Sequence, residues 1–84
     1  MYKLLFSQIV QKQQNDVPKK DLEKIKKLLT DLAENPRPRH SKKLKGGDQD
    51  YRIRYRHWRI LYGIDDEKRL VVIYGILQRK EAYR

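Results

Sequence analysis

The sequence predicts a small α+β domain in which an N-terminal helical hairpin packs against a small antiparallel β-sheet. Two patterns support this: apolar residues recur every three or four positions over residues 18–35, and every second position over residues 51–64. A third observation is the length, because 84 residues suffice for only one small domain. Residues 1–84 are therefore expected to form a single domain with the element order β-α-α-β-β-β.

The first half of the chain is expected to supply the first strand and both helices. Residues 2–7 combine aromatic and aliphatic side chains and are predicted to form a strand, and the glutamine-rich residues 8–15 are predicted to form a short helix. A longer helix should begin near Pro18, which suits a first helical turn, and end at Asn35, because a residue before proline avoids the α conformation. Its apolar stripe consists of Leu22, Ile25, Leu28, Leu29, Leu32 and Ala33.

The second half of the chain is expected to complete the sheet. Its segments are a basic loop over residues 36–50, strands over residues 51–55 and 58–64, a polar turn over residues 65–68, a strand over residues 70–77 and a polar tail over residues 78–84. The strand over residues 70–77 is almost continuously apolar, which is typical of a strand in the interior of a sheet.

A two-residue turn at residues 56–57 predicts which side chains share a face of the sheet. Directly opposite residues point to the same face, so the apolar face should carry Tyr51, Ile53, Tyr55, Trp58, Ile60 and Tyr62. The other face should carry Arg52, Arg54, Arg59 and Leu61, with Arg54 beside Arg59. Like charges placed there cost roughly 0.2–1 kcal/mol. The pair therefore indicates an anion-binding face, and the alternative is a solvated face that protects the sheet from aggregation.

The charge balance predicts a polyanionic partner. Lysine and arginine number 21 against 11 acidic residues, which gives a formal net charge of +10. Nucleic acid is the first candidate, followed by an anionic membrane and an acidic protein. The candidate RNA-binding residues outside the strand face are Arg37, Arg39, Lys42, Lys43, Lys45 and Arg56. The loop that holds most of them can also be read as a solvated linker.

Several classes of site are not expected from this composition. Cysteine is absent, and His40 and His57 lack the spacing of a zinc site, so no metal or cofactor is expected. The two histidines are interpreted as loop and turn residues. Neither a membrane-spanning run nor a secretory leader is recognisable, which favours a cytoplasmic protein. Without a carboxylate pair, any chemistry should be performed by cations and tyrosine, and Tyr83 could either stack on an unpaired base or fold onto the sheet.

Five short stretches carry a family resemblance. They are Asn35-Pro36-Arg37-Pro38, Lys43-Leu44-Lys45-Gly46, Tyr51-Arg52-Ile53-Arg54, Arg59-Ile60-Leu61-Tyr62 and Arg79-Lys80-Glu81-Ala82-Tyr83. In this order and spacing they resemble the RelE/ParE toxin superfamily, and RelE in particular. The resemblance implies a toxin of a type II toxin–antitoxin system. It further implies a ribosome-dependent endoribonuclease that cleaves messenger RNA in the A site without a metal and is held in a complex with an acidic, RelB-like antitoxin.

The resemblance also implies roles for five residues. In the family reaction the ribose 2′-hydroxyl attacks the adjacent phosphate and the 5′-oxygen leaves. By position, Arg59 would stabilise the phosphate, Arg79 would support the phosphate or the leaving oxygen, and Tyr83 would orient the substrate. Arg52 and Arg54 stand where the best-known relative has lysines, one of which is thought to act as base. Arginine stays protonated and is a poor base, so the general base is left unassigned.

Two other functions remain open from the sequence. A ParE-like toxin on the same fold would bind and poison gyrase without catalysis, and it should lack the set formed by Arg59, Arg79 and Tyr83. A plain RNA-binding or ribosome-associated protein would use the basic face for binding only. Mapping transcript ends after incubation with programmed ribosomes distinguishes these alternatives from a nuclease.

Overall fold

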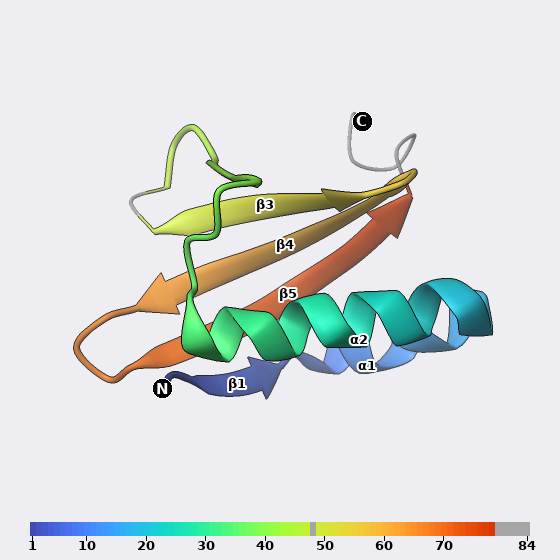
Figure 1. Cartoon of the computed structure of the whole chain (residues 1–84), viewed down its shortest axis with the longest axis horizontal. Coiled ribbons are helices and arrows are strands. Elements are labelled where there is room, and N and C mark those ends of the chain that lie inside the picture. The colour runs from blue at the N-terminus through green and yellow to red at the C-terminus, as the bar shows by residue number, and fades with distance from the viewer. Residues whose placement is uncertain (48, 79–84) are drawn as a thin grey trace.

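This computed structural model describes residues 1–47 and 49–78. These residues form a five-stranded sheet with two α-helices on one face (Figure 1). The elements are β1 (Lys3–Phe6), α1 (Gln8–Gln13), the 3-10 turn η1 (Gln14–Asp16), α2 (Lys19–Glu34), β2 (Ser41–Lys43), β3 (Asp50–Tyr55), β4 (Trp58–Asp65) and β5 (Leu70–Gln78). The predicted α+β class is confirmed, and along the chain both helices follow the first strand and precede the other strands.

The strand order in the sheet is β1-β5-β4-β3-β2. Strands β3, β4 and β5 pair antiparallel, as predicted, and β2 adds to β3 antiparallel. Strand β1 joins β5 in parallel, which the prediction of an antiparallel sheet did not include. Directly after β1, the Ser7 N–H donates to the Ile73 carbonyl oxygen, and the Ser7 side chain caps α1. The short β2 falls within the predicted loop over residues 36–50; its Ser-Lys-Lys sequence has no apolar alternation that would have revealed it.

Local signals in the sequence set the limits of the helices. The Ser7 hydroxyl oxygen accepts a hydrogen bond from Val10 N at 3.2 Å, which satisfies one free donor at the start of α1. Helix α2 begins directly after Pro18 and ends before Asn35, whose backbone is extended as its position before a proline requires. The predicted limits of the long helix are therefore confirmed.

The core lies between the helices and the apolar face of the sheet. The predicted pairing is confirmed, with Tyr55 opposite Trp58, Ile53 opposite Ile60 and Tyr51 opposite Tyr62. These side chains pack with the buried residues Val10, Ile25, Leu29 and Leu32 of the helices and Ile64, Val71, Ile73 and Ile76 of the sheet. Two polar groups in the core are satisfied: Trp58 Nε1 donates to Asp21 Oδ2 at 3.1 Å, and the Tyr62 hydroxyl donates to the Pro36 carbonyl oxygen at 2.8 Å.

A bulge in β5 changes which of its residues face the core. Leu61 pairs with Gly75, but the next residue, Tyr62, pairs with Ile73, so Tyr74 is an extra residue in β5. Strict alternation from Val71 and Ile73 would direct Ile76 away from the core; the extra residue corrects this, and Ile76 is buried. The bulge also places Gly75 beneath Leu61 on the face that the helices leave open.

Candidate active site

The open face of the sheet brings the predicted arginines together. As predicted, Arg54 is directly opposite Arg59 and Arg52 is opposite Leu61. Lys42 of β2 pairs with Arg52, so a further cation lies in the same row across the sheet. Directly opposite residues project to one face, and this cationic row therefore lies on the side away from the helices.

Three of these cations, Arg52, Arg54 and Arg59, share a hollow of about 550 Å³. Its lining residues are Lys43, Leu44, Lys45, Arg52, Arg54, Arg59 and Leu61, contributed by β3, β4, the end of β2 and the segment that follows it. Five of these seven described lining residues are cationic and none is a carboxylate. Mutual repulsion of like charges opposes such a cluster, whereas a bound anion such as a phosphate relieves it.

The end of β2 and the connection to β3 each bring one lysine to this hollow. Leu44 N donates to the Asp50 carbonyl oxygen at 2.8 Å, which ties the end of β2 to the start of β3. Gly46 has a φ of 88°, a left-handed conformation that glycine adopts without strain, and it turns the chain back toward β3. Lys43, the last residue of β2, and Lys45 both line the hollow, which brings a part of the predicted RNA-binding set to the arginines.

Arg59 is buried although it lies on the open face. Only 3% of its surface is exposed, whereas its cross-strand neighbour Arg54 is exposed. The alternative of a merely solvated arginine therefore does not hold for Arg59. A buried guanidinium interacts more strongly with a nearby anion than an exposed one does, because less water screens the charge.

Arg37 is placed apart from the hollow, in a hydrogen-bonded cluster near the other end of β3. Its guanidinium donates to Asp66 Oδ2 at 2.8 Å, to Gln49 Oε1 at 2.6 Å and to the Tyr51 hydroxyl at 2.9 Å. The Tyr2 hydroxyl donates to Asp66 Oδ1 at 2.7 Å. The Arg37 guanidinium and the Tyr2 hydroxyl lower the pKa of Asp66, and the hydrogen bond to Asp66 raises the pKa of Tyr2. This cluster joins the chain before β1, the segment after α2, β3 and the β4–β5 turn.

The remaining predicted site residues are dispersed. Arg56 occupies the β3–β4 turn with a φ of 55°, and its Nη1 atom lies 3.7 Å from Asp21 Oδ1 of α2, on the helix side of the sheet. Arg39 and His40 are exposed in the segment before β2, and His57 is the second residue of the β3–β4 turn. Arg79 and Tyr83 lie outside the described residues. Their proposed roles stay predictions.

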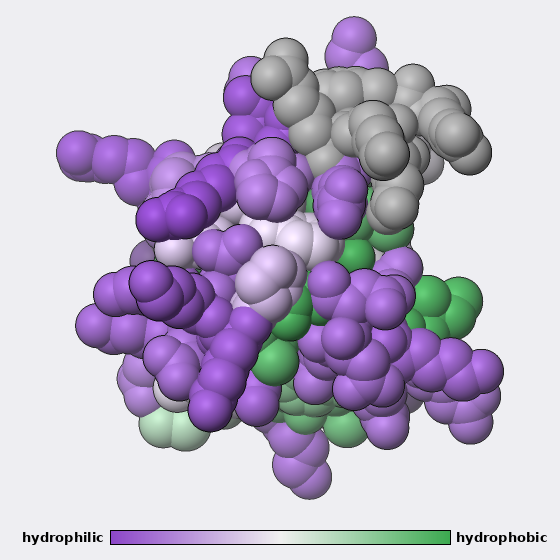
Figure 2. Space-filling model, turned by 90° about the vertical axis from the view of Figure 1, so that its right-hand side faces the viewer, coloured by the Kyte–Doolittle hydropathy of each residue, from purple (hydrophilic) through white to green (hydrophobic). Residues whose placement is uncertain are grey.

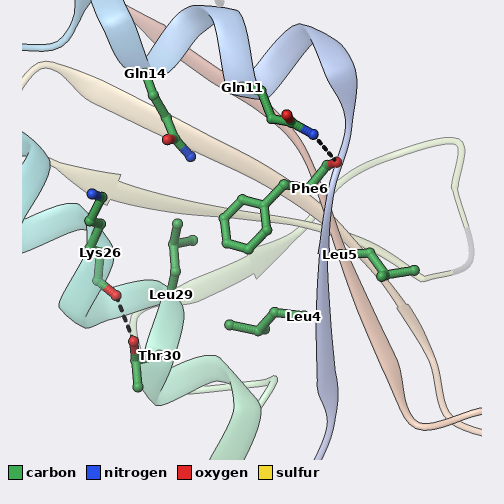
Figure 3. Close-up of a pocket in the computed structure, with 8 residues that line it drawn as sticks. All are labelled: Leu4, Leu5, Phe6, Gln11, Gln14, Lys26, Leu29 and Thr30. Carbon is green, nitrogen blue, oxygen red and sulfur yellow. Dashed lines mark hydrogen bonds between the residues drawn. The ribbon is translucent and has the colours of Figure 1, made fainter.

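A second hollow, with a largely apolar lining, lies away from the cationic hollow. Figure 2 views the end of the molecule where β5 ends and α2 begins, and most of the visible surface there is hydrophilic. The second hollow, of about 530 Å³, lies between β1 and the helices (Figure 3). Its lining is Leu4, Leu5, Phe6, Gln11, Gln14, Lys26, Leu29 and Thr30. With one cation in this lining, it is a poorer match for a polyanion than the cationic hollow.

Two features of the site were not found from the sequence. Leu44 was read as part of a basic loop, and alternation from β2 alone does not place it beside Arg52 and Leu61. Asp66 was interpreted as a polar turn residue, and its ion pair with Arg37 spans 29 positions of the sequence.

Within residues 1–47 and 49–78, no group of three or more His, Cys, Asp or Glu side chains could hold a metal ion. In the same part of the chain, no helix is long and apolar enough to cross a membrane.

Comparisons with known proteins agree with this geometry. The model of the family described as ParE toxin of type II toxin-antitoxin system, parDE, matches residues 2–83. The RelE1 protein of Methanocaldococcus jannaschii is 36% identical over 78 residues, which cover 89% of this chain and 87% of that protein. The isolated E. coli RelE toxin is 30% identical with a TM-score of 0.83, covering 99% of this chain and 92% of that chain. A chain of the intact E. coli RelBE toxin–antitoxin complex is 29% identical with a TM-score of 0.83, covering 93% and 96%.

Proposed function

Because the chain belongs to the ParE toxin family of type II toxin–antitoxin systems, and its relatives are RelE toxins, we propose that it is a metal-independent endoribonuclease that cleaves messenger RNA in the ribosomal A site. The observation that supports this most is the hollow in which five cations surround a space without a carboxylate in its described lining. An activity on translating ribosomes requires the chain to act in the cytoplasm.

The arginines of the hollow suit the charge that develops during phosphodiester cleavage. When the 2′-hydroxyl attacks the adjacent phosphorus, negative charge accumulates on the phosphate oxygens before the 5′-oxygen leaves. The guanidinium of Arg59 would donate to those oxygens, and its burial strengthens the interaction. A guanidinium presents two parallel donors to a phosphate, a geometry that an ammonium group does not reproduce.

Arg52 and Arg54 would act on the attacking hydroxyl without accepting its proton. Arginine stays protonated in proteins and cannot serve as a base. Nearby positive charges favour the deprotonated form of a hydroxyl and lower its pKa. The pair would therefore increase the fraction of reactive 2′-oxyanion, with the proton released to solvent water, and water would protonate the departing 5′-oxygen. Arg79 and Tyr83 would support the leaving oxygen and orient the substrate.

We further propose an acidic, RelB-like antitoxin as the partner that restrains this activity. The support is twofold: similar chains form toxin–antitoxin complexes with RelB, and this chain has a formal net charge of +10. An acidic segment placed over the cationic hollow would neutralise it and exclude RNA. The alternative function is the gyrase poisoning that a ParE-like toxin would perform, and the matching family is described as ParE toxin.

One experiment separates these functions. The purified chain is incubated with ribosomes programmed with a defined transcript, with the naked transcript, and with gyrase and supercoiled DNA, and the 3′ ends of the RNA are mapped. We expect cleavage within the A-site codon only when ribosomes are present, and ends that carry a 2′,3′-cyclic phosphate. Comparable cleavage of naked RNA, or gyrase inhibition without RNA cleavage, would contradict the proposal.

A further inference from the structure

The cationic hollow also contains two apolar side chains. Leu44 and Leu61 line the same space as Arg52, Arg54 and Arg59. Neither leucine belongs to the core: both are partly exposed, and Leu61 lies on the face of the sheet opposite the helices. A phosphate is polar on all sides, so apolar side chains would not contribute to binding a phosphate alone. The combination of guanidinium and aliphatic groups instead matches a ligand with an apolar surface next to its charge.

Both leucines are fixed by the surrounding backbone. Leu44 is tied through its N–H to the Asp50 carbonyl oxygen, at the start of β3. Leu61 lies over Gly75 of β5, where a Cβ atom would come within 3.3 Å of Leu61 Cδ1. The missing side chain at Gly75 leaves the space that Leu61 occupies, and the bulge in β5 sets this pairing. Leu61 therefore packs against the backbone of β5 and presents an apolar surface to the hollow beside the arginines.

The volume of the hollow is also larger than a phosphate alone would fill. Sites for small organic ligands occupy roughly 300–1,000 Å³. The cationic hollow, at about 550 Å³, falls within this range. A phosphate held by the arginines would leave room for a planar group against the leucines. A nucleobase has this form, because its faces are apolar and only its edge is polar.

We propose that Leu44 and Leu61 hold a nucleobase of the substrate strand next to the phosphate that the arginines bind. This inference rests on the proposed action on RNA and adds that the hollow recognises a nucleotide with its base. The leucines act as positioning residues: by fixing the base they orient the attached ribose and its 2′-hydroxyl toward the phosphorus. Any base offers an apolar face, so the contact selects for the presence of a base more than for its identity.

The test compares codons with and without a base. Ribosomes are programmed with a transcript whose A-site codon has 2′-deoxyribose, which prevents cleavage, and with three versions that each lack one base of that codon. Binding of the labelled wild-type chain is compared with that of Leu61→Thr, Leu61→Met and Leu44→Thr. Leu5→Thr, on exposed Leu5 of β1 outside the hollow, is the matched control. Thermal melts by circular dichroism report folding, and Leu44→Thr replaces Leu61→Thr if the latter is destabilised.

We expect Leu61→Thr to weaken binding to the intact codon about tenfold, which corresponds to about 1.4 kcal/mol. Removing one particular base should weaken wild-type binding by a similar factor and abolish the effect of Leu61→Thr, whereas Leu61→Met and Leu5→Thr should bind as the wild type does. An equal effect of Leu61→Thr on all four codons, or none, would overturn the inference. Cleavage of the ordinary transcript is measured alongside. No cleavage by the wild type together with base-dependent binding would overturn the proposed nuclease alone.

Discussion

At the residue scale, Arg59 combines burial with positive charge. With 3% of its surface exposed, it lies beside Arg54 in a hollow that already holds several cations. Removing a charge from water and placing it near like charges both oppose folding. The same arrangement is what stabilises a developing phosphate charge in the proposed reaction. Arg59 is therefore a position where activity and stability are expected to conflict.

Replacing Arg59 by methionine should separate these two effects. Arg59→Met keeps most of the side-chain volume but removes the charge, so we expect the variant to stay folded. Cleavage on saturating ribosomes should fall by about 100-fold, because one donor to the transition state is lost. Arg59→Lys should recover only part of the rate, since an ammonium group lacks the two parallel donors. Single-turnover cleavage and circular dichroism melts measure both quantities.

The control for this series is Arg69→Met. Arg69 is exposed in the β4–β5 turn and does not line the hollow, so its substitution should change neither the cleavage rate nor the melting temperature by much. Wild-type cleavage by Arg59→Met would exclude Arg59 from the site. Unfolding of Arg59→Met would show that the guanidinium is needed for packing.

Tyr62 illustrates the opposite case, a residue used only for stability. It is fully buried on the core face, and burial raises the pKa of its hydroxyl to about 12. Tyr62→Phe would leave the buried Pro36 carbonyl oxygen without the hydrogen bond that it now accepts. We expect a loss of roughly 1–3 kcal/mol in the free energy of unfolding, measured in urea, with cleavage unchanged. A change in cleavage without a loss of stability would contradict this assignment.

At the element scale, the hairpin of β3 and β4 was predicted in detail and the edges of the sheet were not. A two-residue turn and strict alternation suffice to pair Arg54 with Arg59, because both are local properties of one stretch of chain. The direction of β1, the short β2 and the bulge at Tyr74 depend on contacts between distant segments. The candidate site follows the same division: the arginines of the hairpin were predicted, and Leu44 was not.

The cluster around Arg37 holds several elements together, and its strength should depend on pH. In the folded chain the pKa of Asp66 is lowered by the hydrogen bonds from Arg37 and Tyr2. A lowered pKa gives stability that is present above the unfolded pKa, near 4 for aspartate, and lost as the pH falls through the folded value. The pKa of Tyr2 is raised, so its contribution is present below the unfolded pKa, near 10, and lost as the pH rises through the folded value.

Melting curves of wild type and Asp66→Asn as a function of pH test this dependence. We expect the wild type to melt at a higher temperature at pH 7, and the difference to shrink as the pH falls below about 4. Glu67→Gln, one residue away in the same turn and exposed, is the matched control and should show no comparable difference. A difference between wild type and Asp66→Asn that stays constant down to pH 2 would contradict the predicted role of the carboxylate.

At the scale of the whole molecule, a formal net charge of +10 predicts a strong dependence of ribosome binding on salt. Each cation that contacts a phosphate releases a counterion, so the slope of log Kd against log salt reports the number of contacts. We expect Lys45→Gln to reduce this slope by about one, because Lys45 lines the hollow. Lys27→Gln, exposed on α2, should leave the slope unchanged. Equal slopes for Lys45→Gln and the wild type would place the RNA-binding surface elsewhere.

The two faces of β4 have a genetic consequence. Because core and site lie on opposite faces of the same two strands, one register of the β3–β4 hairpin determines both. A single codon inserted within β4 would exchange the faces of the strand residues on one side of the insertion, because successive residues point to opposite faces. Two inserted codons would preserve the faces. Among variants that escape such a toxin, one-codon insertions within β4 should inactivate it far more often than two-codon insertions at the same position.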